Sequence, residues 1–279
     1  MSPLLLAAAL AAAPYSLPFQ LRPTLAADVV RMDTTVATRD DGGVTTASLL
    51  FASTRLAPGV AAYFRAASVW DSPARGNAGW ALGNPVLGAL WVHPLGEAFR
   101  LGAAASLALP LGAGGGESPE ATRARTVRAG IPARAGLDNS LFGINGLTVT
   151  AGVDLSWQHA GFTVQAEATL IQFVRTRGVS EEPDAARTNT TAGLHVAWFA
   201  APWLSLGGEL RVQHYLGTPT VLAVDASARN ILSAAVGARF HVPLGTHWLR
   251  PAVTLARPLD EPLLGRGYTW VQLDVPFIF

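Results

Sequence analysis

Polar and charged side chains recur at alternate positions, between apolar residues, in several segments of this 279-residue chain. Three carboxylates of this kind, Asp154, Glu167 and Glu209, come from successive segments. If these carboxylates meet, they could perform acid–base chemistry, with one donating a proton and another accepting it. Arginines in the same pattern, such as Arg211 and Arg239, would instead neutralise carboxylates as ion pairs. The neighbouring arginines therefore favour ion pairing over catalysis.

Nucleophilic catalysis needs a serine in hydrogen-bond reach of a histidine, with a third group that orients the histidine. On a strand, a histidine and a serine two positions apart share one face. His195 is followed at that spacing by Ala197, and Ser233 lies eight residues before His241. His-x-x-x-His pairs, Asp-rich loops and a Gly-rich loop followed by Lys are also absent from the sequence. We therefore predict no enzyme, no metal site and no cofactor.

The polar residues need elements that hold them on one face, and the periodicity predicts β-strands. In 162–170 apolar residues alternate with Thr, Gln and Glu. The last residues follow the same rule, because Gln272 and Asp274 alternate with an apolar register. A period of two is typical of a strand with one apolar and one polar face, whereas a helix requires a period of 3.6. The apolar register of the last strand is Val271, Leu273, Val275, Phe277 and Phe279.

This alternation predicts an all-β chain of about twelve antiparallel strands. The connections between the strands are alternately short and long after the first one, 39–43. The predicted strands are 26–38, 44–56, 60–71, 83–94, 98–109, 145–158, 162–175, 188–199, 203–215, 229–241, 247–257 and 268–279. The long connections are 72–82, 110–144, 176–187, 216–228 and 258–267. Short turns on one side and long loops on the other are typical of a transmembrane up-and-down β-barrel.

The composition agrees with a membrane barrel. Half of the residues are hydrophobic, 14% are charged and the mean hydropathy is +0.30, yet no apolar run reaches the roughly 18 residues of a transmembrane helix. A closed barrel resolves this, because it pairs every backbone polar group within the membrane. The net charge of +1 gives no basis for nucleic-acid binding. The absence of cysteine excludes disulfides and thiolate chemistry.

The aromatic carboxyl terminus resembles the signal of bacterial outer-membrane β-barrel proteins. The chain ends on Phe277-Ile278-Phe279 after the alternating strand. In such proteins the barrel-assembly machinery reads this signal. The resemblance implies location in the bacterial outer membrane, assembly through Phe277 and Phe279, and contact with outer-membrane lipid and lipopolysaccharide.

The amino terminus is typical of an exported protein. An apolar run from Leu4 to Ala13 resembles the hydrophobic region of a secretory signal peptide, although no Lys or Arg occurs before Arg22. We predict a signal peptide at 1–13, a short periplasmic lead-in at 14–24 and the barrel at 25–279.

The polar register predicts which side chains line the lumen. A charge on the lipid side near the midplane would cost about 2–4 kcal/mol, so charged residues within the strands should face inward. The candidates are Arg31, Asp33, Arg65, Arg100, Asp154, Glu167, His195, Glu209, Arg211, Arg239, Arg250 and Asp274, with Arg55 in the same register. Arginines slightly outnumber carboxylates in this set. The lumen is therefore either a slightly Arg-rich pathway for small solutes or a structural barrel plugged by ion pairs.

The connection 110–144 is the longest and is rich in glycine and arginine. Connections of more than about 12–15 residues without regular structure are usually functional or disordered. In general porins the third external loop folds inward and narrows the channel, and this connection is the third by count. The alternative is a surface loop that meets solvent or lipopolysaccharide. The residues that could constrict the lumen are Arg123, Arg125, Arg128 and Arg134.

Two short motifs carry a family resemblance. Gly83-Asn84-Pro85-Val86-Leu87-Gly88 is followed by Leu109-Pro110-Leu111-Gly112. The pair resembles the Gly-Asp-x-x-Leu-Gly and Leu-Pro-x-Gly pattern of the barrel family named for the MetA pathway of phenol degradation, with Asn84 in place of the Asp. The resemblance covers roughly 30 residues and implies passage of hydrophobic or aromatic compounds.

Overall fold

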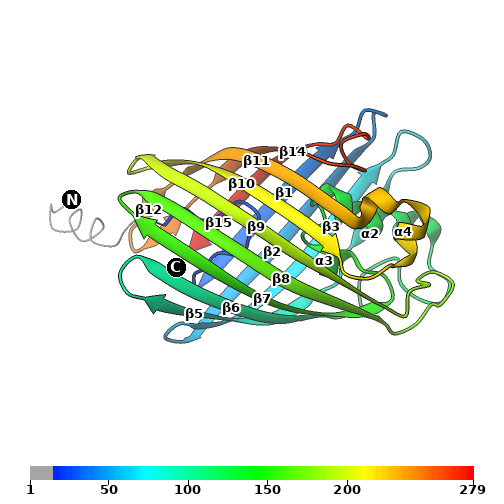
Figure 1. Ribbon diagram of the computed structural model, residues 1–279, viewed down its shortest axis with the longest axis horizontal. Helices are drawn as coiled ribbons and strands as arrows, with labels where there is room; N and C mark the ends of the chain where they lie inside the picture. Colours follow the sequence, from blue (N-terminus) through cyan, green and yellow to red (C-terminus); the bar gives the residue numbers. More distant parts are fainter. Residues whose placement is uncertain (1–14) are drawn as a thin grey trace.

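The computed structural model describes residues 15–279, which form a closed barrel of twelve antiparallel strands (Figure 1). The strands are β1 (Val29–Thr38), β2 (Val44–Ala57), β3 (Val60–Ser72), β4 (Gly79–Leu82) continued by β5 (Val86–Leu95), β6 (Phe99–Ala108), β7 (Gly146–His159), β8 (Phe162–Arg175), β9 (Ala186–Ala201), β10 (Leu204–Tyr215), β11 (Asn230–Phe240), β14 (Ala252–Pro258) and β15 (Thr269–Ile278). Each strand pairs with its neighbours in sequence, and β1 pairs with β15 from Val29↔Ile278 to Thr38↔Thr269. This last pairing removes both sheet edges, so the backbone groups of the wall bond within the sheet. The predicted fold class is confirmed.

The wall is apolar outside and polar inside. In β8, Leu170 is 46% exposed, whereas Thr163 and Gln165 are fully buried. In β15, Val271 and Leu273 are about half exposed. A water-soluble barrel would bury the apolar set and expose the polar set. The inverted pattern indicates that lipid surrounds the outer face.

The two ends of the barrel differ (Figure 1). Short turns and the carboxyl terminus lie at one end, which we name the turn end; the longer connections lie at the other, the loop end. The turn between β7 and β8 places Ala160 at φ 48° and Gly161 at φ 82°. Positive φ at both central residues is characteristic of the type I′ turn, whose twist matches that of the flanking strands.

Two details of the wall differ from the sequence prediction. The strand predicted at 83–94 begins at Val86 as β5, and the strand segment that precedes it, β4 at Gly79–Leu82, lies within the predicted connection 72–82. Beyond the ends of β11 and β14, the predicted tight turn 243–246 belongs to a small hairpin of β12 (Val242–Leu244) and β13 (His247–Leu249). Proline explains the break between β4 and β5, because Pro85 has no N–H to donate to a strand ladder.

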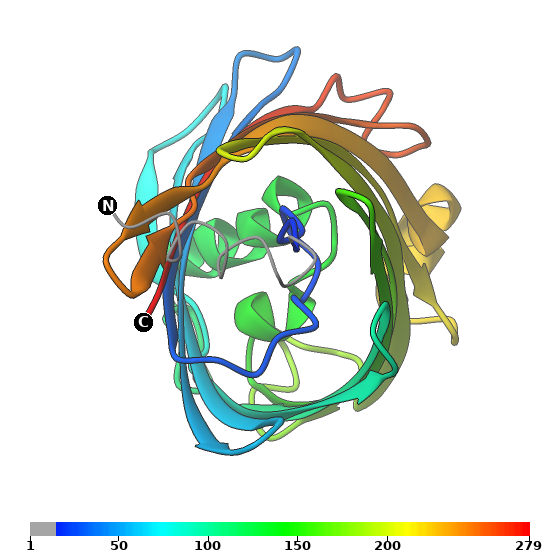
Figure 2. The ribbon, with the colours of Figure 1, turned by 90° about the vertical axis from the view of Figure 1, so that its left-hand side faces the viewer.

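The loop end carries the helical residues. The connection predicted to be 110–144 is 109–145 and contains α2 (Ala121–Ala133) and α3 (Asn139–Phe142), while α4 (Thr220–Val224) and the 3₁₀ helix η1 (Ala226–Arg229) lie between β10 and β11. We name residues 109–145 the inner loop, because α2 and α3 lie within the circumference of the barrel (Figure 2). No helix in residues 15–279 is long and apolar enough to cross a membrane.

The residues before β1 also lie inside the barrel (Figure 2). Tyr15, Leu17, Phe19 and Leu21 are at most 6% exposed. We name residues 15–24 the plug segment. The sequence prediction of a periplasmic lead-in at 14–24 did not anticipate this position, which the segment takes because its apolar side chains leave water. The predicted signal peptide, 1–13, lies outside the described residues.

Candidate functional site: the barrel lumen

All twelve lumen candidates lie on the inner side of the wall or at its turn-end rim. Nine contact the plug segment: Arg31, Arg100, Asp154, Glu167, His195, Glu209, Arg211, Arg239 and Arg250. Asp33 and Arg65 bond to the inner loop, and Asp274 accepts from Arg31 and Arg239, both at 2.6 Å. Arg55, of the same register, is exposed near the turn end instead.

The inner wall holds the plug segment mainly by its backbone. Thr163 accepts a hydrogen bond from the N–H of Ser16 at 3.0 Å, and Arg239 donates to the carbonyls of Leu17 and Pro18, each at 3.1 Å. Similar bonds join other backbone groups of the segment to Glu167, Gln165, Glu209, Arg31, Arg250 and Gln272. These bonds replace the water that the backbone would otherwise bind.

Apolar contacts add to the hold on the plug segment. The ring of Phe19 packs edge-on against His195, with 5.5 Å between centroids, and lies under the guanidinium of Arg239. Leu21 fills the space above Gly193, where an added Cβ would collide with it. A wall glycine therefore makes room for a plug side chain.

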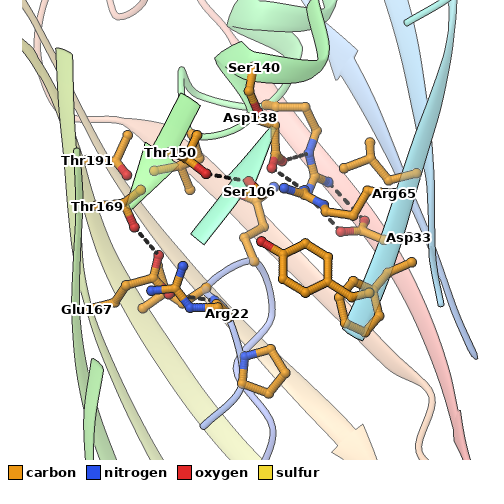
Figure 3. Close-up of a pocket in the computed structure, with 18 of the residues that line it drawn as sticks. Arg22, Asp33, Arg65, Ser106, Asp138, Ser140, Thr150, Glu167, Thr169 and Thr191 are labelled. Atoms are coloured by element: carbon orange, nitrogen blue, oxygen red, sulfur yellow. Dashed lines mark hydrogen bonds and ion pairs between the residues drawn. The ribbon is translucent and has the colours of Figure 1, made fainter. Parts of the chain in front are cut away.

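The inner loop is held by a buried ion-pair network around Arg134. Arg134 is 1% exposed and bonds to both carboxylate oxygens of Asp33, at 2.9 and 2.7 Å, and to Asp138 at 3.0 Å. Arg65 also pairs with Asp138 (Figure 3). Burial raises the pKa of Asp138, but Arg65 and Arg134 lower it more, to about 2. Since Asp138 lies in the loop and stays ionised at neutral pH, the network joins α2 to β1 and β3.

The other three arginines predicted to constrict the lumen lie at the mouth. Arg123 is exposed, Arg125 donates to the carbonyl of Asn77, and Arg128 donates to that of Glu181 at 2.6 Å. The last two tie α2 to neighbouring connections at the loop end. Arg125 also lies 3.5 Å from the carboxylate of Asp71 in β3, but of the four arginines only Arg134 is buried.

Asn84 attaches the inner loop at the break between β4 and β5. Its side chain accepts from the N–H of Gly112 at 3.0 Å and donates to the carbonyl of Gly143 at 2.7 Å. Its own N–H donates to the carbonyl of Leu141 at 2.7 Å. The two sequence motifs therefore meet in space, because Asn84 belongs to the first motif and Gly112 to the second.

A cavity of about 120 Å³ separates the plug segment from the inner loop (Figure 3). One side is aromatic, where Phe51 and Tyr63 stack with 5.6 Å between ring centroids. The rest of the lining is mixed: polar residues such as Thr150, Arg22 from the plug segment and Asp138 from the loop lie beside aliphatic ones such as Leu49 and Ile171. A second, larger cavity of about 500 Å³ opens at the loop end between α2, α4 and the connection 176–185. The plug segment and the inner loop thus divide the lumen into compartments.

The structure brings together one serine and histidine that the sequence search did not pair. The hydroxyl of Ser205 lies 2.9 Å from Nε2 of His241, and the hydroxyl of Ser16 lies 2.8 Å from that of Ser205. All three residues are at most 3% exposed, and within residues 15–279 no carboxylate bonds to the other ring nitrogen of His241. The group therefore lacks the orienting acid and the access that nucleophilic catalysis needs, and it ties the plug segment to the wall.

The two aromatic residues predicted to act in assembly lie at the seam of the barrel. Phe279 is 51% exposed, its N–H donates to the carbonyl of Asp28 at 3.1 Å, and its ring stacks on that of Phe277 at 5.8 Å. Both side chains are therefore near the point where the last strand meets the first.

Sequence reasoning missed the plug segment. The available signal was the alternation of apolar residues at Tyr15, Leu17, Phe19 and Leu21. A segment with so many apolar side chains is not expected to lie free in water. The partners of the segment could not be read from the sequence, because they come from strands across the whole chain.

No protein-family model matches the chain, and no curated protein matches its sequence. Solved structures with a similar fold include the COG4313 outer membrane channel from Pseudomonas putida F1, with a TM-score of 0.63 and 15% identity over 95% of this chain and 100% of that one. The NanC porin gives a TM-score of 0.55 and 9% identity over 90% of this chain and 98% of that one. The KdgM porin, solved with disordered oligogalacturonate, gives a TM-score of 0.51 and 12% identity over 90% of this chain and 99% of that one.

These likenesses concern the fold, which is that of bacterial outer-membrane β-barrel proteins. The apolar outer face and the polar inner face of the wall also indicate that the barrel lies in a membrane. The protein is therefore an outer-membrane β-barrel protein, as the alternating strands and the aromatic terminus predicted.

Proposed function

We propose that small solutes cross the outer membrane through this barrel, and that the plug segment and the inner loop gate the passage. The observation that carries the proposal is what fills the lumen. Two segments that are not part of the sheet, the plug segment and the inner loop, occupy the lumen, with a cavity between them (Figures 2 and 3). The plug segment is continuous with the wall only through β1, so it can leave without breaking any pairing between strands.

The lumen would have a weak preference for anions. Most inner arginines already have a carboxylate partner, as Arg31 and Arg239 have in Asp274. Among residues 15–279, Arg100 and Arg250 form no such ion pair and instead contact Tyr15 of the plug segment. The slight excess of positive charge would therefore act on solutes near the turn end, once the plug segment has moved.

A structural or surface-contact protein with a plugged lumen is the second candidate. The density of polar bonds that hold the plug segment favours it, because each bond to a charged group contributes about 1.5–3 kcal/mol. On either hypothesis, lipid and lipopolysaccharide would cover the exposed apolar face. The barrel-assembly machinery would read Phe277 and Phe279.

Single-channel current separates the two candidates. The full chain is refolded in detergent, its folding is checked by heat-modifiable gel mobility, and the current is recorded in a planar bilayer. Phe19→Lys with Leu21→Lys should release the plug segment, because it replaces two buried apolar side chains with charged ones, and should raise the conductance at least severalfold. Phe19→Leu with Leu21→Met keeps both side chains apolar and serves as the control. A folded lysine variant that carries no current would favour the plugged barrel.

A further inference from the structure

We propose that the inner wall is a binding site for peptide backbone, occupied here by the plug segment, and that short peptides from outside the chain bind to it when that segment leaves. The passage of such peptides through the barrel rests on the proposed function. Their binding does not, since it depends only on the groups that the wall presents.

The wall accepts hydrogen bonds from the N–H groups of the plug segment. Glu209 accepts from Phe19 and, at 3.3 and 3.2 Å, from Gln20. Glu167 accepts from the N–H of Arg22 at 2.6 Å. With Thr163, which binds Ser16, these residues satisfy four N–H groups, namely those of Ser16, Phe19, Gln20 and Arg22. Acceptors that are carboxylates form strong bonds to N–H groups in a site that excludes water.

The wall also donates to the carbonyl groups. Arg250 donates to Tyr15 at 3.1 Å and Gln272 donates to Phe19 at 2.9 Å. The carbonyls bound in this way belong to Tyr15, Leu17, Pro18, Phe19 and Arg22. Nine backbone groups of ten consecutive residues therefore bond to side chains of the barrel, and Pro18, which has no N–H, leaves no donor unsatisfied.

These bonds do not depend on the side chains of the bound segment, so another peptide could form them. The side chains set a preference instead. Phe19 and Leu21 occupy apolar spaces beside His195 and Gly193, and Arg22 pairs with Asp154 at 3.2 Å. The ligand class is therefore a short peptide of about ten residues that is apolar along most of its length and basic near its carboxyl end.

The test measures binding in trans to the full chain that carries Phe19→Lys and Leu21→Lys. The probe is a fluorescently labelled synthetic peptide, Tyr-Ser-Leu-Pro-Phe-Gln-Leu-Arg-Pro-Thr, and the readout is anisotropy in detergent. We expect saturable binding, at least tenfold weaker to the unmodified chain, where the tethered segment competes at a millimolar effective concentration. Methylation of the peptide nitrogens at Phe and Arg removes two N–H donors and should weaken binding about tenfold or more. A peptide of the same composition in scrambled order should also bind more weakly.

Two results would overturn the inference: no saturable binding to the folded variant, or equal affinity for the parent and N-methylated peptides. If the lysine variant does not fold, Arg22→Glu, which Asp154 and Glu167 repel, replaces it. Current distinguishes this inference from the proposed function. Binding without current leaves the peptide site standing and removes the pathway, while current without binding does the reverse.

Discussion

Adjacent residues on one strand of this barrel face lipid and lumen in turn, so the stability cost of a substitution depends on which side the residue faces. Leu170 and Thr169 in β8 are such a pair, because Leu170 is exposed outside and Thr169 lines the cavity between the plug segment and the inner loop. Leu170→Arg should destabilise the barrel by about 2–4 kcal/mol, since it places a charge in lipid near the midplane. Thr169→Arg should cost less, because its charge would lie beside Glu167. Urea unfolding in lipid vesicles measures both, and equal losses would mean that the faces are assigned wrongly.

A similar comparison at 164 and 165, which the alternation alone suggests, is less clean. Gln165 is fully buried and bonds to Tyr15 and to the carbonyl of Arg22. Replacing it would disturb the plug segment even though it faces inward. A matched pair of variants therefore has to be chosen from the tertiary contacts.

Arg134 is at the centre of the buried ion pairs that hold the inner loop against the wall. Arg134→Met would leave Asp33 and Asp138 buried with fewer partners, and loss of one partner of a buried pair costs about 3–5 kcal/mol. We expect a raised and noisier single-channel current. Arg134→Lys should rescue only part of the effect. A planar guanidinium can bond to both oxygens of Asp33 at once, whereas a lysine ammonium lacks this geometry. Currents identical to those of the unmodified chain would exclude this role.

The pKa of Asp138 predicts how acid affects the loop. Because its pKa in the folded protein, about 2, lies below its ordinary value of 3.8, the ion pairs with Arg65 and Arg134 contribute stability above pH 3.8 that is lost as the pH falls toward 2. The current should therefore not change through Asp138 between pH 7 and 5, and should rise below about pH 4. Asp138→Asn is the control and should lack that part of the rise. A rise of equal size in both proteins would assign the effect to groups other than Asp138.

At the scale of elements, the wall and the lumen contents differ in how they are held. The strands are joined by continuous backbone ladders, such as the one that runs from Gly146↔Arg175 to His159↔Phe162 between β7 and β8. The plug segment is held by side chains, and the inner loop by side chains and a few backbone bonds, such as the one from the N–H of Asn84 to the carbonyl of Leu141. They can therefore move at a smaller cost than the wall, which makes them suited to gating.

Removal of the inner loop tests its part in the gate. Deletion of 113–136 takes away α2 and Arg134 but retains the wall, so the barrel should still fold and its conductance should rise. The measurement is single-channel current, with heat-modifiable mobility as the check on folding. An unchanged conductance in a folded deletion variant would mean that the inner loop does not limit the passage.

At the scale of the whole molecule, the barrel depends on closure between its first and last strands. The N–H of Phe279 donates to the carbonyl of Asp28, beside the last residue pair of β1 and β15. Deletion of Phe279 should lower the yield of folded protein in the outer membrane severalfold, because it removes the aromatic terminus. Phe279→Trp keeps an aromatic group and should restore most of the yield. Normal yield without Phe279 would contradict an assembly role.

Much of the wall could be predicted from the sequence, because its rule is local. Each of the twelve predicted strands has a counterpart, and the polar register places residues such as Asp154 and Asp274 on the inner face. The failures occur where a partner is distant. The break at Asn84 serves the inner loop 28 residues further along, at Gly112, and the contact of Ser205 with His241 joins two strands.

The sequence by itself determined that this chain is a membrane barrel, because alternation, turn spacing and composition act over a few residues at a time. Only the tertiary structure decided what the lumen contains. The plug segment is bound by side chains from β1, β8, β10, β11 and β15 at once. Such a site exists only after the sheet has closed, since closure brings residues as far apart as Phe19 and Gln272 within a hydrogen bond of each other.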